Sequence, residues 1–238
     1  MEKVKAVLTG HSRGLGAAIA TELAAHGIPT LALARSKGAA AKGLLQVELD
    51  LSDTTALAAW LAGDQLEQFA AGAGTVLLIN NAGMLQPVGP LAAQAPDQVA
   101  RAVALNVAAP LMLAAGVAAL PAADRRVLHV SSGAGRTAYP GWAVYCAGKA
   151  ALDHHARAAA LDAAPGLRVC SLAPGVIDTD MQAQIRASDP ASFPLRERFE
   201  ALKREGQLDA PADCARKLLQ FLLSADFGRQ PVGDLRDA

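Results

Sequence analysis

Three residues in the second half of the chain have side chains suited to proton transfer: Ser132, Tyr145 and Lys149. Tyr145 and Lys149 are four residues apart in a helix-like segment, so both side chains leave one face of the helix. A phenol with a pKa of about 10 is a poor acid–base catalyst at neutral pH, but an adjacent ammonium stabilises phenolate and lowers that pKa. Ser132 follows a predicted strand, where its hydroxyl could bind the oxygen that gains or loses the proton. The three residues therefore predict proton transfer at a carbonyl or alcohol oxygen.

Each of these residues also has a simpler explanation. A Tyr and a Lys at this spacing are more often a surface accident than a catalytic pair, and Ser131 and Ser132 could be ordinary turn residues. A serine hydrolase using Ser132 is a further alternative, but the surrounding Val130-Ser-Ser-Gly133 has no GxSxG turn. The proton-transfer hypothesis therefore needs support from a second motif.

A glycine-rich turn, Thr9-Gly10-His11-Ser12-Arg13-Gly14-Leu15-Gly16, follows the first predicted strand. Gly10 permits a tight turn, Gly14 lets a phosphate approach the backbone, and Gly16 allows the next helix to pack closely on the strand. The helix N-terminus then offers N–H groups and a favourable dipole to a pyrophosphate. An ordinary strand–helix turn is the alternative, but the flanking strand and helix favour a dinucleotide-binding turn.

The end of the second predicted strand, Leu31-Ala-Leu-Ala-Arg35-Ser36, bears on which nucleotide binds. An acidic residue here would bind a ribose 2′-hydroxyl and favour NAD(H). No carboxylate is present, and Arg35, together with Arg13 in the glycine turn, could pair with a 2′-phosphate. Two solvated surface arginines are the alternative, yet the missing acid favours NADP(H).

The elements that must position these residues alternate along the chain. Predicted strands cover residues 4–8, 30–34, 45–49, 75–79, 127–130 and 167–172. Helix-like segments lie near residues 15–26, 54–71, 97–120, 143–163 and 211–224. This order predicts an α/β fold, a Rossmann-like doubly wound parallel sheet of six or seven strands with helices on both faces in three layers. A seventh strand within 228–233 is only weakly patterned.

Four motifs occur in one order: TGxxxGxG from Thr9 to Gly16, Asn80-Asn-Ala-Gly83, Ser132, and Tyr145-Cys-Ala-Gly-Lys149. In this order they resemble the short-chain dehydrogenase/reductase family over roughly residues 4–180. The resemblance implies an NAD(P)-dependent oxidoreductase acting on CH–OH groups. Tyr145 would be its general acid and base, Ser132 would hold the substrate oxygen, and Lys149 would also bind the nicotinamide ribose. The motifs specify the family and leave the substrate open.

The resemblance also assigns the remaining site residues. It implies that Asn106 is a fourth catalytic residue, holding a water that links Lys149 to solvent. A structural hydrogen bond from Asn106 to the backbone is the alternative. The predicted cofactor contacts, from the glycine turn and the resemblance together, are Gly10, Ser12, Arg13, Gly14, Leu15, Gly16, Arg35, Asp50, Leu51, Asn81, Ala82, Gly83, Tyr145, Lys149, Pro174, Gly175, Val176 and Thr179.

The composition excludes several classes of protein. Hydrophobic residues make up 52% of the 238, and 22 basic residues balance 22 acidic ones, which argues against a disordered chain and a generally basic nucleic-acid binder. Three scattered cysteines offer no spacing for a metal site. The start lacks a signal-peptide pattern, and the apolar stretch 102–123 is interrupted by Pro and Gly, which favours a buried helix over a membrane span. We therefore expect a cytoplasmic protein with no metal, nucleic-acid or membrane partner.

The pattern also predicts how the chain is organised. We expect one domain over residues 1–238, with the polar segment 180–208 leaving the sheet as a substrate lid. Tyr139 and Trp142 would border a pocket that tolerates apolar groups. The ligand would be a small carbonyl or alcohol.

Two further expectations concern assembly and activity. The resemblance implies a homodimer or homotetramer joined through the Ala-rich helix 143–163, where His154 and His155 would be surface or subunit-contact residues. The alternative function is a non-catalytic NADP(H)-binding regulator on the same scaffold. The intact Ser132, Tyr145 and Lys149 argue against that alternative, because a sensor need not keep proton-transfer groups.

Overall fold

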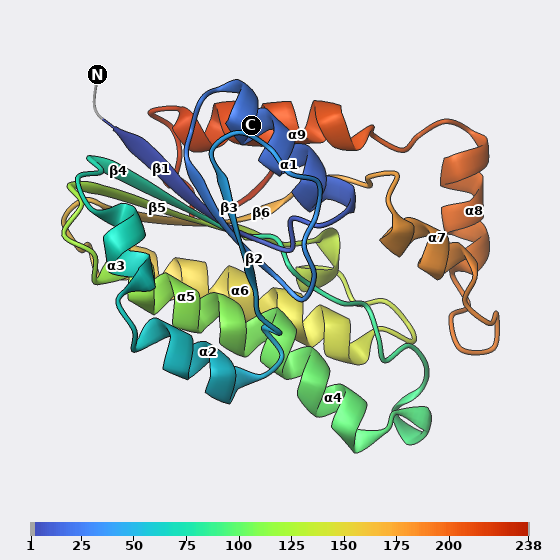
Figure 1. Ribbon diagram of the computed structural model, residues 1–238. Helices are drawn as coiled ribbons and strands as arrows, with labels where there is room; N and C mark the ends of the chain where they lie inside the picture. Colours follow the sequence, from blue (N-terminus) through green and yellow to red (C-terminus); the bar gives the residue numbers. More distant parts are fainter. Residues whose placement is uncertain (1–2, 238) are drawn as a thin grey trace.

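The computed structural model describes residues 3–237 and contains a parallel β-sheet between two layers of helices (Figure 1). Its seven strands are ordered β3-β2-β1-β4-β5-β6-β7, and all neighbouring strands run parallel. The expected Rossmann-like α/β fold is confirmed. Residues 1, 2 and 238 of the predicted domain lie outside the described residues.

The strands lie where short apolar runs predicted them. They are β1 (Val4–Thr9), β2 (Thr30–Ala34), β3 (Leu44–Glu48), β4 (Thr75–Asn80), β5 (Asp124–Val130), β6 (Leu167–Ala173) and β7 (Val232–Asp234). β2 and β4 are buried along their whole length, as strands covered on both faces should be. The weakly patterned seventh strand does form, and it pairs with β6 from Ser171 to Ala173.

Helices cover both faces of the sheet, with α1 and α9 on one face and α2, α3, α5 and α6 on the other (Figure 1). The longest of them are α1 (Gly14–Ala25), α9 (Pro211–Leu223), α5 (Ala109–Ala118) and α6 (Ala143–Leu161). Alternate residues of β1 belong to different cores: Ala6 and Leu8 pack with α1 and α9, whereas Val7 packs with the opposite layer. The sheet therefore separates two apolar cores.

The segment predicted as one helix over 54–71 is two helices, α2 (Thr54–Leu61) and α3 (Gln65–Ala70). Asp53 caps the start of α2 by accepting a hydrogen bond from the backbone N–H of Ala56 (2.9 Å). After α2 the N–H of Gly63 bonds to the carbonyl of Trp60 (3.2 Å), a tight turn that ends the helix. The prediction missed this break because a single glycine is a weak helix breaker.

The segment predicted over 97–120 is also interrupted. It contains α4 (Pro96–Val103), a π-helical turn (Ala104–Ala108) and α5. Pro110 has no N–H to donate to the carbonyl of Asn106, so the α-helical ladder has to rearrange there. Pro96–Ala118 is the one helix in residues 3–237 long and apolar enough to cross a membrane by length and composition. Core helices can pass the same test, and α5 packs in the core beside the sheet.

The predicted excursion over 180–208 contains two short helices, α7 (Asp180–Arg186) and α8 (Arg196–Arg204), which project beyond the sheet (Figure 1). Most charged side chains of α8 are exposed. Its Phe199 is nevertheless buried, together with Phe193 from the preceding loop. An apolar cluster therefore attaches the lid to the rest of the protein.

Candidate active site

The motif residues meet at the carboxyl ends of the parallel strands, in one cavity of about 660 Å³. The loops after β1, β2, β3, β4, β5 and β6 form its walls, as expected for an open α/β sheet. Every predicted cofactor contact lines this cavity, as do three of the four predicted catalytic residues, Ser132, Tyr145 and Lys149. Asn106 lies behind the wall.

The glycine turn has no room for side chains at two of its positions. A Cβ atom on Gly16 would lie 2.0 Å from the carbonyl oxygen of Gly10, and Gly10 itself has a φ of +71°. Asn81 holds the turn from β4, because its side-chain N–H groups donate to the carbonyls of Thr9 (3.0 Å) and Gly10 (3.2 Å). The Thr9 hydroxyl in return accepts the N–H groups of Asn81 and Ala82. These bonds explain why the two motifs occur together.

The turn fits a phosphate ligand. α1 begins at Gly14 without a side-chain hydrogen bond capping its N-terminus and without an acidic residue in its first turn. Its first N–H groups therefore keep their capacity to donate, and the helix dipole favours an anion there. Gly14 also packs against Thr179, which would stand 3.5 Å from a Cβ atom at this position. The residues present thus fit a dinucleotide pyrophosphate.

The charged residues at the far end of the cavity come from three elements. Arg35 follows β2, Asp50 follows β3, and Arg101 lies on α4, with its guanidinium 3.0 Å from the Asp50 carboxylate. Burial would raise the pKa of Asp50, but hydrogen bonds from Ser52 and the charges of Arg101 and Arg35 hold it below its ordinary value. Arg101 was not predicted, because nothing in the sequence links it to Asp50.

Arg13 in the glycine turn forms an ion pair with α7. Its guanidinium is 3.9 Å from the carboxylate of Asp180, the first residue of α7. Both side chains are about two-thirds exposed, at 66% and 68%, so water screens this ion pair. Arg13 therefore remains free to exchange Asp180 for another anion.

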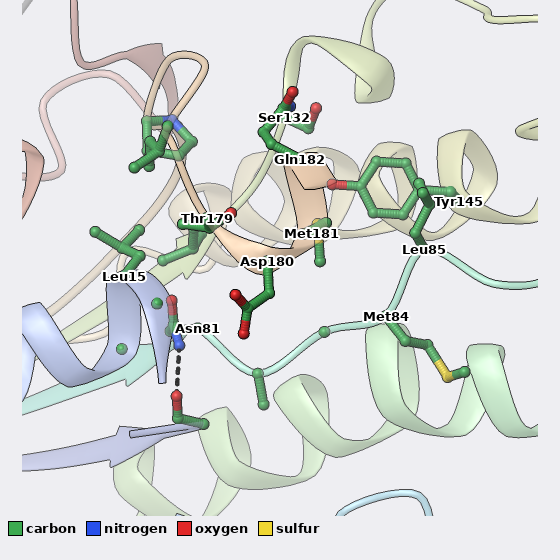
Figure 2. Close-up of a pocket in the computed structure, with 18 of the residues that line it drawn as sticks. Leu15, Asn81, Met84, Leu85, Ser132, Tyr145, Thr179, Asp180, Met181 and Gln182 are labelled. Carbon is green, nitrogen blue, oxygen red and sulfur yellow. Dashed lines mark hydrogen bonds between the residues drawn. The ribbon is translucent and has the colours of Figure 1, made fainter. Parts of the chain in front are cut away.

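Tyr145 and Ser132 face each other across the substrate end of the cavity. Tyr145 points its hydroxyl from α6 into the cavity, toward the side where Ser132 and Met181 lie (Figure 2). Burial raises the pKa of Tyr145 to about 12, although the Ser132 hydroxyl favours the phenolate and opposes this. The sequence predicted a lowered pKa for Tyr145. With the residues of the protein itself this prediction is wrong, because burial of the phenol has the largest effect on the pKa.

Lys149 lies beneath Tyr145 on the same face of α6. Its ammonium donates a hydrogen bond to the carbonyl of Val130 (2.7 Å) and lies 5.6 Å from the centroid of the Tyr145 ring. Burial lowers the pKa of Lys149 to about 8, while the nearby Asp153 carboxylate acts in the opposite direction. The Lys149 charge does not offset the effect of burial on the pKa of Tyr145.

Asn106 makes the backbone bonds that the sequence analysis named as the alternative. Its carbonyl accepts the N–H of Met84 (2.9 Å), and its amide donates to the carbonyl of Met84 (2.8 Å). Only Gly83 separates it from Lys149, since a Cβ atom there would be 3.3 Å from the Asn106 oxygen and 3.9 Å from the Lys149 nitrogen. Asn106 thus fixes the loop after β4 beside Lys149.

Aromatic side chains build the outer wall of the cavity. Trp142 stacks on Phe193 with ring centroids 4.6 Å apart and planes 4° from parallel. Phe199, Tyr139 and Tyr145 surround the same indole at 5.3–5.6 Å. Tyr139 and Trp142 border the cavity as predicted, whereas Phe199 was missed because it follows them by more than fifty residues.

Comparison with known proteins agrees with this geometry. The family described as short chain dehydrogenase matches residues 4–190. A benzil reductase ((S)-benzoin forming) from Bacillus cereus is 31% identical and covers 96% of each chain, and a sepiapterin reductase from Meriones unguiculatus is 36% identical over 93% of this chain and 92% of its own. A crystal structure of a short-chain dehydrogenase/reductase from Burkholderia vietnamiensis is 50% identical, covers 99% and 98% of the two chains, and superposes with a TM-score of 0.71. This chain belongs to the short-chain dehydrogenase/reductase family.

Short-chain dehydrogenases/reductases are NAD(P)-dependent oxidoreductases acting on CH–OH groups, so this chain is such an enzyme. The nucleotide would lie along the wall from Arg35 through the glycine turn to Lys149. When bound, it would supply or accept a hydride. Within residues 3–237 no cluster of three or more His, Cys, Asp or Glu side chains could hold a metal ion.

Behind the site of this short-chain dehydrogenase/reductase lies a row of buried polar side chains that the sequence analysis missed. His129 on β5 is fully buried between Asn80 and His155, at 3.1 Å from each. Burial, together with the charges of His155 and Lys149, lowers the pKa of His129 to about 3, so its ring stays neutral. His155 therefore points inward, contrary to the expected surface role, while His154 is exposed.

Proposed function

We propose that the protein is an NADPH-dependent carbonyl reductase, which reduces a ketone or aldehyde to an alcohol or catalyses the reverse reaction. The observation that carries this proposal is the shared cavity: Ser132, Tyr145 and Lys149 open into the same space as the glycine turn. A substrate oxygen between the two hydroxyls would thus lie in the cavity that the nucleotide enters.

The residues of the chain would bind the substrate oxygen and move the proton. Ser132 donates a hydrogen bond to the carbonyl oxygen, and Tyr145 gives its proton to that same oxygen. A raised pKa suits this direction, because it keeps Tyr145 protonated until the oxygen becomes basic. The Ser132 hydroxyl then favours the phenolate, and the Lys149 ammonium, 5.6 Å from the ring centroid, would attract its negative charge. The roles reverse for alcohol oxidation.

We propose a preference for NADP(H) over NAD(H). Support comes from the end of β2, where Arg35 stands in place of an acidic residue and lines the cavity. Arg13 lines it too, and its exposed ion pair with Asp180 is weak enough for a phosphate dianion to replace the carboxylate. Two guanidiniums would then face the 2′-phosphate.

We propose that the carbonyl carries a bulky aromatic or apolar group. Support comes from the wall of Tyr139, Trp142 and Phe199 beside Tyr145, which matches flat apolar surfaces. Relatives named benzil and sepiapterin reductases also act on ring-bearing carbonyl compounds by their names. Aryl ketones and aryl 1,2-diketones are therefore the first substrates to test.

We propose that the protein assembles as a homodimer or homotetramer through α6, as the family resemblance implies. Light scattering after size-exclusion chromatography would measure the mass in solution. A particle of the 24.3 kDa monomer mass at micromolar concentration would contradict this proposal.

The function is tested by NADPH oxidation over a panel of aldehydes, ketones, diketones, pterins and acyl-thioester ketones. The wild-type protein is expected to oxidise NADPH with aryl carbonyls, and Tyr145→Phe to lose about 10²- to 10⁴-fold in kcat, as for loss of a general acid. NADPH affinity should change by less than about twofold, since the phenol hydroxyl contributes little to nucleotide binding. Retained turnover in Tyr145→Phe would end the catalytic assignment, and NADPH binding without any turnover would favour the regulator alternative.

A further inference from the structure

α6 also carries a buried carboxylate, Asp153, with an exposed fraction of 1%. One of its oxygens accepts hydrogen bonds from the hydroxyls of Ser131 (2.8 Å) and Ser171 (2.7 Å). The other accepts a hydrogen bond from Arg136 (3.0 Å). Asp153 stands one helical turn after Lys149, on the same face of α6.

The donors come from three separate parts of the chain. Ser131 follows β5, Ser171 lies on β6, and Arg136 follows the short turn after Ser132. Arg136 also donates to the carbonyl of Gly233 on β7 (2.8 Å). One side chain of α6 is thus bonded, directly or through Arg136, to the last three strands of the sheet.

A carboxylate this deeply buried is costly unless it is well paired. Asp153 has a guanidinium on one oxygen and two hydroxyls on the other, so both oxygens are satisfied. A bond made only for stability would need no charge here, since apolar residues of equal volume would pack at least as well. Stability alone therefore does not explain why a buried carboxylate lies one helical turn from Lys149.

Lys149 and Asp153 are hydrogen-bonded to two consecutive residues, Val130 and Ser131, where β5 ends. We call the segment from Val130 to Ser132 the β5 exit. Lys149 donates to the carbonyl of Val130, and Asp153 accepts from the hydroxyl of Ser131. The next residue is Ser132, whose hydroxyl would bind the substrate oxygen. The register between α6 and the β5 exit therefore sets where the Ser132 hydroxyl stands relative to Tyr145.

We propose that Asp153 is a positioning residue that fixes α6, and with it Tyr145 and Lys149, against the β5 exit that carries Ser132. This inference rests on the catalytic roles proposed above for Ser132, Tyr145 and Lys149. Asp153 itself does not line the cavity, so it would touch neither substrate nor nucleotide.

Ser131→Ala and Ser171→Ala form a matched pair for the test. Each removes one buried hydroxyl that donates to the same Asp153 oxygen at nearly the same distance. Ser131 precedes Ser132 and also lines the cavity, whereas Ser171 lies on β6, away from the cavity wall. A role in stability alone predicts equal effects on activity, whereas positioning predicts unequal ones.

The expected result is that Ser131→Ala lowers kcat about 10- to 100-fold with aryl carbonyls, as misplacement of a reacting group does. Ser171→Ala should lower kcat less than about threefold, and both variants should keep KM and NADPH affinity within about twofold. Both melting temperatures should fall by a similar few degrees. Equal kcat values in the two variants would overturn the proposal.

Asp153→Asn adds a readout that depends on charge. Lys149 is faced by Tyr145 and Asp153 on α6, by His129 on β5 and by Asn106, and of these only Asp153 has a carboxylate side chain. Removing the anion should move the alkaline decline of kcat/KM to lower pH, and Ser171→Ala should leave that decline in place. An unchanged decline in a folded Asp153→Asn protein would also count against the proposal.

Crystal structures of the wild type and both serine variants decide the positional claim without any assay of activity. The proposal expects the Ser132 hydroxyl to move by at least about 0.5 Å relative to the Tyr145 hydroxyl in Ser131→Ala, and not in Ser171→Ala. If the wild type reduces no carbonyl, the proposed function fails, and these structures still show whether Asp153 sets the register.

Discussion

The glycine turn can form only because Gly16 has a hydrogen atom in place of a side chain. Any Cβ atom there would lie 2.0 Å from the Gly10 carbonyl and 2.5 Å from the amide nitrogen of Asn81. The first contact is with backbone, which cannot rotate away, so the turn has to shift. The geometry that presents N–H groups to a phosphate therefore depends on this one residue.

Gly16→Ala is accordingly expected to abolish measurable NADPH binding and to destabilise the fold by about 1–3 kcal/mol, the cost of overpacking. Tryptophan-to-nucleotide energy transfer and thermal unfolding measure the two effects. Gly63→Ala is the control, since a Cβ atom there meets only the carbonyl oxygen of Trp60 at 3.4 Å and Gly63 lies outside the cavity. Normal NADPH affinity in Gly16→Ala would contradict the role given to the turn.

Arg35 is expected to determine whether the protein prefers NADPH or NADH. Replacing it with Asp should weaken NADPH binding by about 1.5–3 kcal/mol, or roughly 10- to 100-fold, because a 2′-phosphate would lose a charge-assisted bond. NADH binding should weaken far less or improve. Arg157→Asp, an equal charge change at an exposed residue outside the cavity wall, controls for net charge. Titration of both nucleotides is the measurement, and an unchanged preference would refute the phosphate site.

The pKa of Lys149 predicts how activity depends on pH. Burial lowers this pKa to about 8, so the ammonium is present below pH 8 and is lost as the pH rises through that value. kcat/KM for carbonyl reduction should therefore decline above about pH 8, since this parameter reports groups of the free enzyme. Tyr145, with a pKa of about 12, stays protonated throughout that range. A profile flat from about pH 7 to 10 would contradict the proposed role of the Lys149 charge.

At the scale of elements, the segment proposed as a lid is attached by aromatic stacking and lines part of the cavity. Phe193 is fully buried under Trp142, and Phe199 on α8 reaches the cavity itself. The two residues belong to one cluster but differ in whether they line the cavity. Substrate selectivity should therefore depend on α8 more than on the loop before it.

Phe199→Ala is expected to raise KM for aryl ketones about 10-fold or more relative to a small aliphatic aldehyde, because an aromatic contact worth about 0.5–1.5 kcal/mol and its buried area are lost. Steady-state kinetics on both substrates measure the ratio. Phe221→Ala, which removes a ring packed on Phe227 on the opposite face of the sheet, controls for general destabilisation. Equal changes for both substrates would show that Phe199 does not contact the aryl group.

The elements also show what the sequence could and could not predict. The strands and α6 were predictable because their apolar periods are set by local residues, and the Tyr145–Lys149 spacing places two side chains on one face. The π-helical turn depends on Pro110 acting one turn ahead, and the end of α2 depends on Gly63, both weak local signals. Arg101 and Asp153 act through partners from distant segments, so no local pattern could assign them.

At the scale of the whole molecule, nucleotide binding should stabilise every part that lines the cavity. Loops after six strands and both helices α7 and α8 contribute to its wall, so a bound dinucleotide would contact segments far apart in sequence. A ligand at 100 times its Kd stabilises the native state by about 2.7 kcal/mol. For a chain of this length that is roughly 5–11 °C in Tm.

NADPH should accordingly raise Tm by several degrees, and NADH at the same concentration should raise it less. Differential scanning fluorimetry measures both shifts, and Arg35→Asp should narrow the difference between them. An equal shift from both nucleotides would contradict the NADP(H) preference, while no shift from either would contradict the nucleotide site itself.

Because all seven strands run in the same direction, the residues with a proposed chemical role lie together at the carboxyl ends of the strands. The loops that lead into the strands, such as residues 71–74 before β4, lie at the amino ends of the strands. Ala71 in this loop is exposed. A peptide tag, a fluorophore or a tether to a solid support placed there would be separated from the reacting groups by the length of the strands. The molecule thus offers an attachment point that leaves its chemical face free to meet substrate.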